Sequence, residues 1–85
     1  MKFTVYSKPG CVQCNGTYRA MDKKGLEYNK IDVSQNEEAL ELTKSLGHMQ
    51  APVVVKWADN GDIEDHWSGF NPEKIEEYAQ AVKAA

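Results

Sequence analysis

Residues 7–14, Ser-Lys-Pro-Gly-Cys-Val-Gln-Cys, join a segment that favours a strand to one that favours a helix. The preceding run, Lys2–Tyr6, is rich in strand formers and ends where a Pro-Gly pair interrupts it. The following run, Cys11–Lys24, has apolar residues at the spacing of a helix. Its apolar face carries Cys14, Tyr18 and Met21. The two cysteines of the chain are therefore predicted at a strand-to-helix turn, at the N-terminus of the first helix.

Hydrophobic periodicity and turn residues predict the element order β-α-β-α-β-β-α. Three successive valines, Val53 to Val55, predict a central strand buried on both faces, and Pro52 marks its start because proline cannot donate to a ladder. The remaining elements expected are a strand at Tyr28–Val33, a helix opened by a Ser34/Glu37 capping box with Leu42 and Leu46 inward and Gly47 at its end, a hairpin turn at Asp59–Asp62, a strand at Ile63–Trp67, and a helix opened by Asn71 and Pro72 with Ile75, Tyr78, Ala79 and Val82 on its apolar face. We predict an α/β fold, a four-stranded mixed sheet with three helices, in one domain spanning residues 1–85.

Length and composition narrow the classes of function. The chain has 85 residues, of which 41% are hydrophobic and 27% are charged, as in ordinary globular proteins. No apolar run approaches the roughly 20 residues that cross a bilayer, and no export signal is visible, so we expect a cytoplasmic protein without membrane contact. Ten Lys and Arg against thirteen Asp and Glu leave no basic footprint for nucleic acid. We expect a monomer.

The spacing of the two cysteines favours redox chemistry over a structural role. A Cys11–Cys14 disulfide closes a very short loop, which contributes only roughly 2 kcal/mol of stability. At the start of a helix, free amides favour the thiolate of Cys11, and Lys8 adds a positive charge. We predict that Cys11 attacks a target disulfide and that Cys14, on the apolar face, resolves the mixed disulfide. The other interpretations are two inert thiols, or half of a zinc site, for which His48 and His66 are unpaired and far along the chain. We expect no metal and no cofactor.

Other polar and aromatic residues have ordinary interpretations. His48 and His66 are expected to lie at the surface or in packed positions, and the acidic run from Asp59 to Asp65 is expected to be a solvated hairpin. The segment Trp67-Ser68-Gly69-Phe70 places two large aromatic residues in a loop before the last helix. These two aromatic residues have two possible roles, packing in the core or contact with a partner protein, and the sequence does not decide between them.

Three stretches of the chain resemble a known family. A strand followed by Cys-x-x-Cys on a helix, an x-Pro before the third strand, and a final hairpin and helix resemble the thioredoxin fold, in the short form typical of glutaredoxins. More specifically, Cys11–Cys14, Gln50–Val55 and Trp67–Phe70 are similar to the corresponding motifs of NrdH-redoxins. The match runs from Thr4 to about Ile75, which is nearly the whole chain.

This resemblance implies a dithiol-disulfide oxidoreductase that acts as an electron carrier. It would take electrons from thioredoxin reductase and pass them to class Ib ribonucleotide reductase through a redox-active Cys11/Cys14 disulfide. The resemblance also implies that the Ala51-Pro52 bond is cis and lies beside the disulfide, with the Trp67–Phe70 loop near the active site. The partner-binding residues would be Lys8, Val12, Gln13, Ala51, Pro52, Trp67, Ser68, Gly69 and Phe70.

Two alternatives accompany this prediction. A glutathione-dependent glutaredoxin needs amide and cationic donors for the two carboxylates of glutathione, but bulky aromatic residues occupy the Trp67–Phe70 segment, so we expect weak glutathione binding. A non-catalytic binding module of the same fold would leave the cysteines incidental. The chain departs from the family pattern at Asn71, where arginine is common, and in the hairpin from Trp57 to Asp65, which is longer than usual.

Overall fold

The computed structural model describes residues 2–84 and shows the predicted order of strands and helices. The elements are β1 (Lys2–Ser7), α1 (Val12–Lys23), β2 (Asn29–Asp32), the 3-10 helix η1 (Val33–Gln35), α2 (Glu37–Ser45), β3 (Val53–Trp57), β4 (Ile63–Ser68) and α3 (Pro72–Ala84). The strands form one sheet in the order β2-β1-β3-β4. β1 is parallel to β2 and antiparallel to β3, and β3 is antiparallel to β4, so the sheet is mixed.

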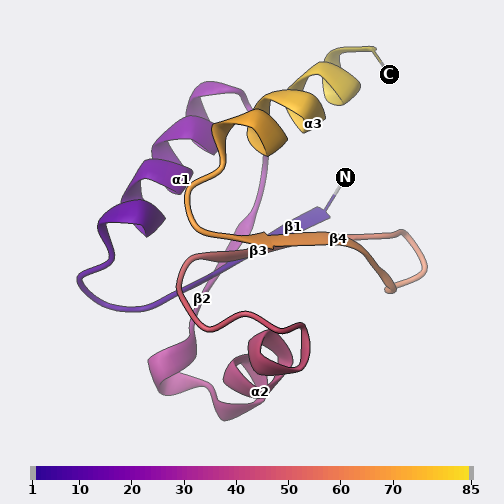
Figure 1. The fold of residues 1–85 in the computed structure, drawn as a ribbon. Coiled ribbons are helices and arrows are strands. Elements are labelled where there is room, and N and C mark those ends of the chain that lie inside the picture. The colour runs from indigo at the N-terminus through magenta and orange to yellow at the C-terminus, as the bar shows by residue number, and fades with distance from the viewer. Residues whose placement is uncertain (1, 85) are drawn as a thin grey trace.

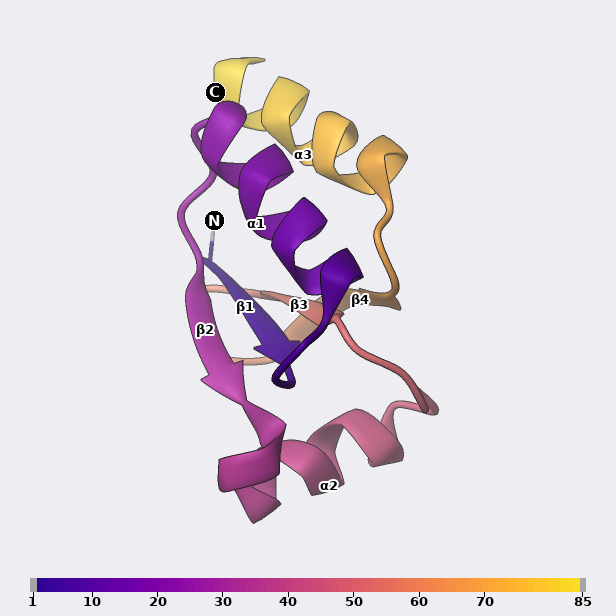
Figure 2. The same ribbon diagram turned by 90° about the vertical axis from the view of Figure 1, so that its left-hand side faces the viewer.

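The helices lie on both faces of the sheet. α1 and α3 pack side by side on one face, and α2 covers the other (Figures 1 and 2). Successive side chains of β3 point to opposite faces of the sheet. Val54 joins the core beneath α1 and α3, while Val53 and Val55 join the core beneath α2. These three valines are at most 3% exposed, which confirms the prediction of a strand buried on both faces. The junction between β1 and α1, which carries the cysteines, follows a central strand that has β2 on one side and β3 on the other.

Two predictions around the second strand are wrong. The strand ends at Asp32, and Val33–Gln35 form a 3-10 turn because the Asp32 carboxylate accepts hydrogen bonds from the amide and hydroxyl of Ser34, at 2.9 and 2.6 Å. With its side chain engaged there, Ser34 does not cap α2. Asn36 does so instead, its side-chain oxygen accepting from the amide of Ala39 at 3.0 Å.

The last helix begins as predicted and extends past the core. Asn71 caps α3 by accepting a hydrogen bond from the amide of Lys74 at 3.1 Å, and Pro72 takes the first helical position. Ile75 is buried, but Val82 is 42% exposed and lies outside the core cluster that Ile75 joins. The prediction that Val82 faces inward is therefore wrong, because the helix has passed the apolar cluster by its last turns. No helix within residues 2–84 is both long and apolar enough to cross a bilayer.

Candidate functional site

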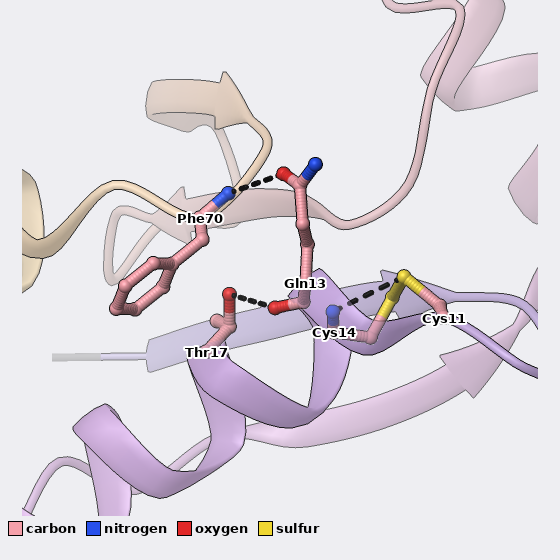
Figure 3. Close-up of a disulfide and its surroundings, with 5 residues drawn as sticks. All are labelled: Cys11, Gln13, Cys14, Thr17 and Phe70. Carbon is pink, nitrogen blue, oxygen red and sulfur yellow. Dashed lines mark hydrogen bonds between the residues drawn. A yellow bond between two sulfur atoms is a disulfide. The ribbon is translucent and has the colours of Figure 1, made fainter.

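A disulfide joins Cys11 and Cys14 at the N-terminus of α1 (Figure 3). Cys11 is the N-cap residue, with extended backbone angles, and its Sγ accepts a hydrogen bond from the amide of Cys14 at 3.1 Å. The Pro9-Gly10 turn produces this position, because it lies between the end of β1 at Ser7 and the start of α1 at Val12. The structure thus places Cys11 at the helix tip, where an amide and the helix dipole stabilise a thiolate when the pair is reduced.

The two cysteines differ in their access to solvent. Cys14 is 2% exposed, whereas Cys11 is partly exposed and its neighbour Val12 is 82% exposed. Thr17 is fully buried on the same face of the helix as Cys14, and its hydroxyl donates to the carbonyl oxygen of Gln13 at 2.9 Å. The sequence analysis did not single out Thr17, although it lies three residues after Cys14, a spacing that places it on the buried face. A thiol at position 11 can therefore meet a target, and one at position 14 cannot without rearrangement.

Two hydrogen bonds join the Trp67–Phe70 loop to α1, which carries the disulfide, and to the proline loop, residues 46–52 between α2 and β3. The amide of Phe70 donates to Oε1 of Gln13 at 3.0 Å (Figure 3). The amide of Gly69 donates to the carbonyl oxygen of Pro52 at 2.8 Å, and the Ala51-Pro52 bond is cis, as the resemblance implied. Three segments that are far apart in the sequence thus form one continuous site.

The aromatic residues of this loop have different environments. Trp67 is 6% exposed and stacks on Tyr78, with ring centroids 5.9 Å apart. Phe70 is 44% exposed, and its ring lies over Gly16 of α1, 3.7 Å from where a Cβ would stand. Trp67 therefore packs in the core, whereas the Phe70 ring is exposed, and contact of Phe70 with a partner stays a prediction.

A cavity of about 150 Å³ lies between α2 and the proline loop. The sequence-predicted residues Lys8 and Ala51 line it, so they lie on the α2 side of the site. Lys44 adds a second cation, and the nearby Met49 is 90% exposed. The rest of the lining consists of Tyr6, Val33, Leu40, Thr43, His48, Gln50 and Val53. The sequence analysis missed this cavity because its walls come from four separate stretches of the chain.

His48 and His66 form a hydrogen-bonded pair, contrary to the expectation that they are unpaired. Nε2 of His48 lies 2.8 Å from Nδ1 of His66. The pair forms because the loop after α2 passes over β4, 18 residues further along the chain. Burial, and then the charge of His66, lower the pKa of His48, so the fold favours its neutral form. Within residues 2–84, no group of three or more metal-ligating side chains surrounds them.

Asp65 also departs from the solvated position predicted for it. Its Oδ2 accepts from Nζ of Lys74 at 2.8 Å and from the hydroxyl of Tyr78 at 2.5 Å. Partial burial, the largest single cause, favours the protonated acid, but it is outweighed by these two hydrogen bonds together with that from the His66 amide and the charge of Lys74, so the pKa of Asp65 is lowered. Burial, the largest cause, and the hydrogen bond to Asp65 raise the pKa of Tyr78. Asp65 thus fastens the start of α3 to β4, while Asp59 and Asp62 stay exposed in the turn as predicted.

Comparisons with known proteins agree with this geometry. A family model described as Glutaredoxin matches residues 3–57. The Glutaredoxin-like protein NrdH of Escherichia coli (strain K12) is 39% identical over 85 residues, covering 100% of this chain and 98% of that protein. Its counterpart in Salmonella typhimurium is 37% identical over 75 residues, covering 88% and 85%. The solved structure of the NrdH-redoxin from Escherichia coli superposes with a TM-score of 0.80 at 36% identity, covering 91% and 93%.

A disulfide at a helix N-terminus on this mixed sheet defines a redox protein of thioredoxin-like fold. The chain belongs to the glutaredoxin family and, within it, to the glutaredoxin-like NrdH-redoxins.

Proposed function

We propose that this protein is a cytoplasmic dithiol-disulfide carrier that takes electrons from thioredoxin reductase and delivers them to class Ib ribonucleotide reductase. The observation that carries the proposal is the Cys11–Cys14 disulfide, with one sulfur at the helix tip and the other cysteine buried. The Escherichia coli relative of solved structure is described as having a thioredoxin-like activity profile. The similarity of the three sequence motifs to NrdH-redoxins supports the choice of donor and acceptor.

The proposed cycle balances over two exchange steps. The Cys11 thiolate attacks one sulfur of the target disulfide, forming a mixed disulfide and releasing the other target sulfur as a thiolate. The Cys14 thiolate then attacks the sulfur of Cys11, which restores the Cys11–Cys14 disulfide and frees the second target sulfur. Two electrons and two protons pass from the carrier to the target. The reductase supplies two electrons, and two protons are taken up, to convert the disulfide back into the dithiol.

The surface around the disulfide suits a protein partner better than a small acid. Among the described residues, the exposed large hydrophobic side chains are Val12, Met49, Phe70 and Val82. The first three lie on segments of the site, and only Val82 lies away from it. Exposed apolar side chains on all three segments of the site support a protein partner.

The start of α3 also has few amides left for a carboxylate of glutathione. Gln13 accepts from the amide of Phe70, Asn71 accepts from the amide of Lys74, and Pro72 has no amide hydrogen. These internal bonds favour thioredoxin reductase over glutathione as the source of electrons.

The decisive experiment follows NADPH oxidation with insulin as the disulfide substrate. One reaction contains thioredoxin reductase, and the other contains glutathione with glutathione reductase. We expect turnover in the first and little in the second, with none for Cys11→Ser in either. Turnover only with glutathione would contradict the proposed donor, and no turnover in either would indicate a non-catalytic module. Formation of deoxyribonucleotides by class Ib ribonucleotide reductase with this carrier tests the acceptor.

A variant that traps the intermediate tests the roles of the cysteines. Cys14→Ser removes the resolving thiol, so we expect mixed disulfides with target proteins to accumulate through Cys11. Peptide mass mapping of the trapped species identifies the linked cysteine, and Cys11→Ser is the matched control. Equal trapping by Cys11→Ser through Cys14 would show that the assignment of roles is wrong.

A further inference from the structure

Gln13 links the disulfide helix to the far end of the chain. Its position is fixed from the side of the helix, because it lies between the two bonded cysteines and its carbonyl oxygen accepts from the buried Thr17 hydroxyl. Its side chain leaves the helix and accepts from the amide of Phe70, 57 residues away (Figure 3). The amide oxygen of Gln13 thus holds Phe70 in place relative to the sulfurs.

One glycine makes room for this contact. Gly69 has a φ of +79°, and a Cβ on it would stand 3.2 Å from Oε1 of Gln13. The Phe70 ring also lies near Gly16 of α1, where a Cβ would meet it at 3.7 Å, an ordinary contact distance. The loop therefore meets α1 through the Gln13–Phe70 hydrogen bond, with the Phe70 ring next to Gly16.

We propose that Gln13 is a positioning residue, whose side-chain oxygen orders the Gly69–Phe70 segment and holds the Phe70 ring as a preformed part of the surface that protein partners bind. The proposal rests on the proposed function, in which a protein partner docks around the disulfide. A segment that is already ordered binds with a smaller loss of conformational entropy than a free one. Gln13 acts before the chemical step and touches no reacting atom. Removing its side-chain oxygen is therefore expected to raise KM and to leave kcat unchanged.

A matched pair of variants separates the hydrogen bond from the size of the side chain. Gln13→Met keeps the length of the side chain and removes the acceptor, whereas Gln13→Glu keeps an acceptor oxygen. Gln80→Met makes the same change on α3, where the side chain of Gln80 donates to Glu76, the one partner it has among the described residues. A lost hydrogen bond of the usual net strength corresponds to roughly a 2- to 10-fold weaker interaction.

Amide hydrogen exchange measured by NMR tests positioning without any partner. We expect the Phe70 amide to exchange several-fold faster in Gln13→Met than in the parent, and to remain protected in Gln13→Glu and Gln80→Met. Unchanged exchange in Gln13→Met would overturn the proposal, whatever the partner assays show.

Steady-state kinetics with thioredoxin reductase test the consequence for binding. We expect Gln13→Met to raise KM by roughly 2- to 10-fold with kcat nearly unchanged, and Gln13→Glu to restore KM. Reduction by dithiothreitol, which needs no docking surface, is expected at the parent rate. A fall in kcat without a change in KM, or no rescue by Gln13→Glu, would overturn the proposal. If the parent itself is not a substrate of thioredoxin reductase, the proposed function fails. The role of Gln13 is then decided by the exchange data together with the KM values of parent and variants for insulin.

Discussion

Replacing Gly69 by alanine tests how tightly the loop is fitted to the disulfide helix. The backbone of Gly69 has a φ of +79°, where an L side chain costs roughly 1–2 kcal/mol. The new Cβ would also stand 3.2 Å from Oε1 of Gln13, so that side chain must move and weaken its hydrogen bond to Phe70. The lost hydrogen bond adds roughly 0.5–1.5 kcal/mol. We expect Gly69→Ala to lower the free energy of unfolding by about 1.5–3.5 kcal/mol.

A second glycine provides the control for backbone strain. Gly61 in the hairpin turn has a φ of +92°, and nothing lies within 4 Å of a Cβ added there. Gly61→Ala should therefore lower the free energy of unfolding only by the backbone strain of roughly 1–2 kcal/mol. Urea unfolding of the oxidised protein at pH 7 measures both variants. The excess cost at Gly69 should disappear when Gln13 is first changed to alanine, as a double-mutant cycle shows.

The result that would refute this reasoning is equal destabilisation by Gly69→Ala and Gly61→Ala. An excess at Gly69 that persists in the Gln13→Ala background would also refute it, because the cost would then not arise from Gln13.

Two further predictions concern pH. Because the pKa of His48 is lowered in the fold, the unfolded chain binds more protons, and stability should fall as pH drops below the unfolded pKa of about 6.5. His48→Asn should flatten the dependence of unfolding free energy on pH between about 5 and 7, and an unchanged slope would contradict the assigned cause. Because the pKa of Asp65 is lowered, its contribution is complete above the unfolded pKa of about 3.9 and is lost as pH falls through the folded pKa. Asp65→Asn should lower the free energy of unfolding by about 1–2 kcal/mol at pH 7, and urea titrations should show a smaller difference below about pH 4. A difference in unfolding free energy that does not depend on pH would contradict the role of the carboxylate.

The sequence alone determined the elements and the chemistry that each carries. Local spacing identified the helix that begins after Cys11, because 3.6-residue periodicity and a preceding Pro-Gly turn depend only on near neighbours. Three successive valines identified the central strand, and Asn71 with Pro72 identified the start of the last helix. One local feature was predicted wrongly: the side chain of Ser34 bonds to Asp32 and not to the helix, so Asn36 caps α2.

Tertiary structure decided which of these residues meet. The Gln13–Phe70 bond, the His48–His66 pair and the contact of Asp65 with Tyr78 all join different elements. The burial of Trp67 and the exposure of Phe70 were likewise undecided in the sequence, because both are apolar residues of one short segment. Hydrophobic pattern states which residues prefer to be buried, but strand order, register and helix placement decide which partner each finds. The cysteine pair is therefore evident from the sequence, whereas the surface that surrounds it exists only in the folded chain.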